Sequence, residues 1–98
     1  MQDQYYYAFA IGQLPDPLLH PIRARKTADF FKTLPGFIGL HIVSDPRRNA
    51  TLLVFDTLNN AKIARNRIGA TGNSTAKHIM RAKLENDGQT ITILDVAD

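Results

Sequence analysis

Residues 34–57 read LPGFIGLHIVSDPRRNATLLVFDT, and this stretch carries the clearest pattern of strands and turns in the chain. Two apolar runs within it, FIGLHIVS (37–44) and ATLLVF (50–55), contain no Asp, Glu, Lys or Arg. The residues between them, DPRRN (45–49), are charged or turn-forming, and a Pro-Gly pair precedes the first run. Apolar, β-branched runs bounded by such residues predict strands, so we predict a β-hairpin here.

We predict one helix before this hairpin and one after it. For the first helix, Asp16 and the proline that follows it are a good capping pair, but Pro21 would then fall inside the first turns. We therefore place that helix at residues 21–32. After the hairpin, Thr57 is a suitable N-cap for a helix over residues 58–68.

Three further strands complete the predicted order β-α-β-β-α-β-β. They cover residues 5–12 (YYYAFAIG), 77–84 (KHIMRAKL) and 89–96 (QTITILDV), with a hairpin turn at Asn86-Asp87-Gly88 before the last. Two helices on one face of an antiparallel sheet is the economical packing for this order. We predict an α+β fold of the ferredoxin-like βαββαβ type with an extra C-terminal strand, as one domain over residues 1–98.

Composition excludes several classes of protein. The net charge is only +3, and the 12 Lys and Arg are spread along the chain instead of forming a basic block. There is no cysteine, so disulfides and thiolate metal sites are excluded. The apolar run at residues 5–11 is too short to span a membrane, and residues 1–4 lack the basic region of a signal peptide. We expect a cytoplasmic location and no membrane partner.

The predicted sheet has two apolar faces, although one face of such a sheet is usually polar. We expect one set of alternating residues to face the helices, and the other set to face away. The first set is Ile38, Leu40, Ile42, Leu52 and Val54. The second set is Phe37, Gly39, His41, Val43, Thr51, Leu53 and Phe55, together with Tyr5, Tyr7 and Phe9 or their neighbours. An apolar face of this size needs a cover, which is another subunit's sheet, a bound ligand, or both.

The segment LPGFIGLHIVSD, the charged turn, TLLVFDT and an alanine-bearing helix resemble the dimeric α+β barrel (antibiotic-biosynthesis-monooxygenase-like) superfamily over roughly residues 34–68. The resemblance implies a homodimer with two sheets face to face, and ligand pockets between sheet and helices. The chain has no tryptophan, so residues that some members use beside a haem or a quinol have no counterpart here. The resemblance therefore implies a fold and a dimer, and leaves open whether the protein is an enzyme.

Six residues are candidates for binding a small hydrophobic or aromatic ligand. A histidine in an apolar strand can orient a ligand, tyrosines present an apolar ring with a polar tip, and a basic residue can hold a carboxylate. The more ordinary roles of these residue types are interface packing, strand packing and solvation. The histidines lack metal-ligand spacing, no catalytic set is apparent, and we expect neither a metal nor a cofactor. The candidates are Tyr5, Tyr7, His41, Phe55, His78 and Arg81.

Two other functions fit the same element order. An RNA-recognition-motif-like nucleic-acid binder is one, because FAIGQLP (9–15) resembles the first strand of such domains. Against it, residues 49–55 lack the basic-Gly-aromatic-x-aromatic pattern on which bases stack. A non-catalytic regulatory or structural dimer without a ligand is the other.

Overall fold

The predicted order of elements is confirmed by the computed structural model, which defines residues 4–12, 14, 17–45, 48–72, 75, 77–86 and 90–98, without the side chains of 42–45 and 48–50. Asp16 and the middle of both predicted turns, at 45–49 and 86–88, lie outside the described residues. The elements are β1 (Tyr6–Ile11), α1 (Pro21–Lys32), β2 (Phe37–Asp45), β3 (Arg48–Phe55), α2 (Leu58–Ala70), β4 (Met80–Leu84) and β5 (Ile91–Val96).

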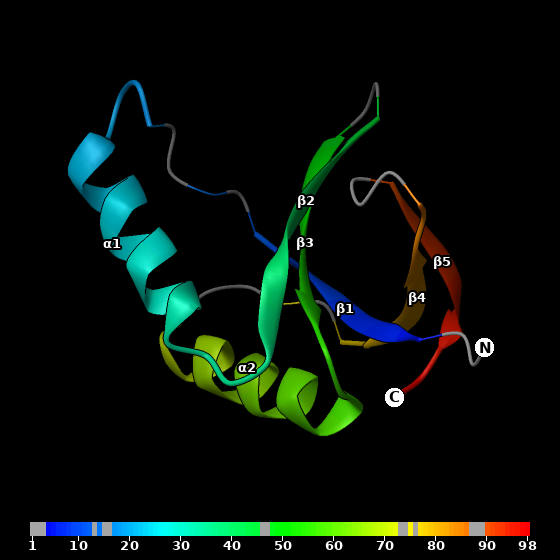
Figure 1. Ribbon diagram of the computed structural model, residues 1–98. Coiled ribbons are helices and arrows are strands. Elements are labelled where there is room, and N and C mark those ends of the chain that lie inside the picture. Colours follow the sequence, from blue (N-terminus) through cyan, green and yellow to red (C-terminus); the bar gives the residue numbers. More distant parts are fainter. Residues whose placement is uncertain are drawn as a thin grey trace.

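The described strands form one antiparallel sheet in the order β2-β3-β1-β4-β5. This arrangement is an α+β fold consistent with the ferredoxin-like class. Figure 1 shows the β2–β3 hairpin and the β4–β5 hairpin on opposite sides of β1, which lies at the centre of the sheet. Helix α2 packs mainly on β1 and β3.

The core lies between the sheet and the two helices. Phe9, Leu53, Phe55 and Ile79 supply the sheet side, and the rings of Phe9 and Phe55 stack with their centroids 5.7 Å apart. The remaining members are Phe31 and Leu34 at the end of α1, with Ala61, Ala64 and Ile68 from α2.

The predicted assignment of faces was wrong for most residues. Tyr7 pairs with Phe55 and Phe9 pairs with Leu53, and all four pack in or against the core on the helix side. Phe37 also packs against that core, and Thr51 shares its side because it pairs with Ile11. Leu52 and Val54, expected to face the helices, therefore face away. Both sets of alternating residues are apolar, so hydrophobicity alone did not distinguish them.

A β-bulge near the start of β2 changes which residues of that strand face the helices. Phe37 pairs with Phe55, but the next pair is Gly39 with Val54, which leaves Ile38 as an extra residue. Beyond the bulge His41 pairs with Leu52, so His41 faces away from the helices as predicted.

Two short turns connect the helices to the strands next to them in sequence, one between α1 and β2 and one between β3 and α2. The hydroxyl of Thr57 accepts a hydrogen bond from the backbone N–H of Asn60 at 3.1 Å, which confirms the predicted N-cap of α2. Gly36 adopts φ +72°, and a Cβ there would overlap the Asp56 carboxylate.

Within the described part of the chain, neither helix is long and apolar enough to cross a membrane.

Candidate functional site

The side of the sheet opposite the helices, here called the open face, is apolar across all five strands. Paired residues in an antiparallel sheet point to the same side, so the register identifies its members. None of the members whose side chains are described carries a charge. They are Gly39 and His41 on β2, Leu52 and Val54 on β3, Tyr6, Ala8 and Ala10 on β1, Met80, Ala82 and Leu84 on β4, and Ile91, Ile93 and Val96 on β5.

The open face is concave, with small residues at its centre. Ala8, Val54 and Ala82 are completely buried although they lie on the side away from the helix-side core. Ile38 at one end of the sheet and Leu94 at the other are both extra residues in β-bulges, which bend strands and increase their twist. Figure 1 shows the sheet bending around this side between the β2–β3 hairpin and the β4–β5 hairpin. Neighbouring side chains cover the small central ones.

The β4–β5 hairpin points its apolar side to the open face. Arg81 pairs with Asp95 and Lys83 pairs with Thr92, which puts the polar side of the hairpin on the helix side of the sheet. An alternating strand normally turns its apolar side to the protein interior. The hairpin is thus patterned for an interior on the side of the sheet that has no helices.

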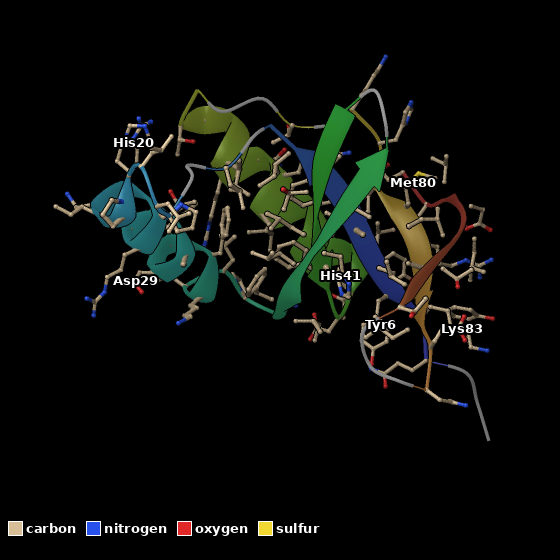
Figure 2. The ribbon with its side chains drawn as sticks, turned by 90° about the horizontal axis from the view of Figure 1, so that it is seen from above. Tyr6, His20, Asp29, His41, Met80 and Lys83 are labelled. Carbon is tan, nitrogen blue, oxygen red and sulfur yellow. The ribbon has the colours of Figure 1, made fainter. Side chains whose placement is uncertain are left out.

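His41 is the polar group near the middle of this apolar surface. It is half-buried, stands opposite Leu52, and makes no side-chain hydrogen bond with the residues that the structure describes. Figure 2 shows His41 on the same part of the molecule as Tyr6 and Met80, far from His20 and Asp29 on the α1 side. A partly desolvated imidazole in this position can donate or accept one hydrogen bond from a group that covers the face.

Three of the six predicted residues meet at a different place, on the helix side of β1 and β4. The guanidinium of Arg81 lies 4.5 Å from the centre of the Tyr5 ring, and the register places Tyr7 beside Arg81. Arg81 also donates through Nε and Nη2 to the Asp95 carboxylate at 2.9 and 2.7 Å. This hydrogen bond to Asp95 raises the pKa of Arg81. The pairing with Asp95 uses two of the five guanidinium N–H donors and offsets the positive charge that would attract an anionic ligand.

The other two candidates do not join these groups as accessible binding residues, although Phe55 pairs with Tyr7 on the same side of the sheet. Phe55 is fully buried in the helix-side core. His78 is exposed, and its Nδ1 lies 3.3 Å from the backbone oxygen of Asp98. The Asp98 carboxylate is paired with Arg65 at 2.9 Å and with Lys62 at 3.9 Å. The six residues therefore do not form one site.

Sequence reasoning missed most of the open face, including Tyr6, Leu52, Met80 and Leu84. Apolar and basic residues alternate in residues 80–84, which predicts a strand with one apolar side. Which face of the sheet this side occupies follows only once β4 is known to pair with β1. Among the described residues, no three His, Asp or Glu side chains gather in a way that would hold a metal ion. No family model, curated protein or solved structure matches this chain.

Proposed function

We propose that the protein is a homodimer that joins two open faces, and that the space between them binds a small apolar or aromatic molecule. The orientation of the β4–β5 hairpin carries this proposal. Its charged side lies on the helix side of the sheet while Met80, Ala82 and Leu84 point to the open face. In an isolated chain Ala82 is covered by its neighbours, but Ile93 and Val96 on the same side of the hairpin are 41% and 56% exposed. A covering surface would bury them.

A second copy of the chain is the cover that fits best. Two identical faces meet across a twofold axis, so each residue meets its own kind or its neighbours on the partner. Two copies of a face with a net charge would repel each other. The members of the open face whose side chains are described carry no charge, so this repulsion does not arise from them. Apolar sheets pack face to face at about 10 Å, with their side chains filling the layer between them.

The pattern of residue sizes favours a ligand between the sheets. Ala10 on the open face is only half-buried and fills little of a layer of that thickness, whereas Ala8 and Ala82 are already covered by neighbouring side chains. The larger residues, Leu52, Met80 and Leu84, surround them. The imidazole of His41 and the phenol of Tyr6 supply the few polar groups that orient a ligand in a mostly apolar pocket.

Nucleic-acid binding has less support. Arg81 and Lys83 lie on the helix side, so they are not beside the rings of the open face. That face has only Tyr6 and His41 as described rings, and single-stranded nucleic acids require stacking rings next to cations. A nucleic-acid binder of this fold would carry both on the same face.

Native mass spectrometry of the gently purified chain tests the proposal, because it reports subunit number and retained ligand together. We expect the mass of two chains plus a small molecule. Ala10→Leu is the informative variant: Ala10 is only half-buried, so the larger residue fills the space between sheets and should remove the ligand but keep the dimer. A wild-type dimer without added mass would support the dimer and contradict the proposed ligand. A monomer would reject both.

A further inference from the structure

The turn before α1 and the first turn of this helix carry apolar side chains that the residues described by the structure leave exposed. Leu19 and Ile22 are 73% and 71% exposed, and Leu18 before them is 92% exposed. The helix is anchored to the core at its other end, through Phe31. Figure 1 shows the start of α1 at an extremity of the molecule, away from the sheet.

Three cations surround this apolar end. Arg23, Arg25 and Lys26 are all exposed, and residues 17–28 contain no Asp or Glu. At 100° per residue, Arg25 and Lys26 fall on either side of Ile22. The result is an apolar tip with a basic rim.

Helix stability does not explain this arrangement. Cations near a helix N-terminus oppose the helix dipole, and the first turn of α1 contains no acidic residue to offset them. His20, at the N-cap, makes no capping hydrogen bond with its side chain. The basic apolar tip therefore weakens the start of α1, which points to a role outside the fold.

We propose that this tip binds an anionic lipid surface, with Leu19 and Ile22 in the boundary below the headgroups and Arg23, Arg25 and Lys26 on the phosphates. Protruding apolar side chains next to cations match the layered chemistry of a membrane surface, apolar inside and negative outside. The expectation of no membrane partner considered only segments that span a bilayer, and surface binding needs no such length. This proposal does not depend on the dimer.

Co-sedimentation of the full chain with vesicles tests it. We expect binding to vesicles of phosphatidylcholine with phosphatidylserine, and at least tenfold weaker binding to phosphatidylcholine alone or at high salt. Arg23→Gln and Lys26→Gln should each weaken binding by roughly fivefold. Leu19→Ser, which keeps the charge, should weaken it by roughly tenfold. Lys32→Gln removes an equal charge from the far end of the same helix and serves as the control.

Several results would overturn this inference. Equal losses for Lys32→Gln and Lys26→Gln would mean that net charge alone drives the binding. Unchanged binding of Leu19→Ser would show that the apolar tip does not insert into the vesicle surface. A chain that ignores both kinds of vesicle but binds soluble polyglutamate would indicate an acidic protein partner instead.

Discussion

Phe37 and His41 lie four residues apart on one strand and point to opposite faces of the sheet. An even spacing in a regular strand would put them on the same face. The extra residue at Ile38 shifts the alternation of side chains between the two faces by one position. Phe37 therefore contacts the core, and His41 faces outward beside Leu52. The bulge allows β2 to serve the helix-side core at its start and the open face further along.

Replacing His41 by Asp should dissociate the proposed dimer. A carboxylate in the middle of the apolar face would lose hydration on assembly, and its copy across the twofold axis would repel it. We expect sedimentation velocity to show a folded monomer at concentrations where the wild type is dimeric. His20→Asp, an equal change on the exposed α1 side, should leave the dimer intact. If both variants stay dimeric, His41 is not at the interface.

Replacing Phe55 by Leu should lower stability without changing the number of subunits. Phe55 is fully buried and stacks on Phe9 on the helix side, so the smaller residue leaves part of that space empty. We expect a loss of about 1–2 kcal/mol in the free energy of unfolding, measured with urea. Phe30→Leu, at a position 36% exposed, should cost less than about 0.5 kcal/mol. If Phe55→Leu loses the dimer while the stability of the monomer is unchanged, the Phe55 ring lies on the open face and not in the helix-side core.

The order of the elements could be predicted because each has a local signal. Pro21 starts α1, Thr57 caps α2, and uncharged runs separated by turn residues mark β2 and β3. The faces could not be predicted in the same way, because Leu52 and Leu53 are equally apolar and only their partners across the sheet distinguish them. A one-residue bulge such as Ile38 leaves no mark in composition. Arg81 could be recognised as a basic strand residue, but its pairing with Asp95 depends on the β4–β5 register.

Replacing Gly36 by Ala should destabilise the chain more than the same change at Gly72. Both glycines have positive φ, at +72° and +87°, so each substitution has a backbone cost of about 1 kcal/mol. Only at Gly36 does the new methyl group also meet the Asp56 carboxylate, which Asn60 holds through a 2.8 Å hydrogen bond. We expect a total loss of about 2–4 kcal/mol for Gly36→Ala in urea unfolding. Equal losses at both positions would show that the turn relaxes at no cost.

Replacing Arg81 by Gln should leave both the dimer and any retained small molecule unchanged. Arg81 lies on the helix side, where Asp95 and the Tyr5 ring hold it, so it does not reach the open face. Native mass spectrometry of this variant checks the result. A variant that remains folded but has lost its ligand would move the binding site to the helix side, and Lys83→Gln, on the same side of β4, would then show whether charge alone is responsible.

Sedimentation equilibrium of the wild-type protein determines whether a second copy of the chain covers the open face. If it does, we expect a single species with twice the mass of the 98-residue chain, which converts to monomer only on strong dilution. A monomer that persists at the highest soluble concentration would contradict it, because Ile93 and Val96 on the apolar side of the β4–β5 hairpin would then remain exposed to water.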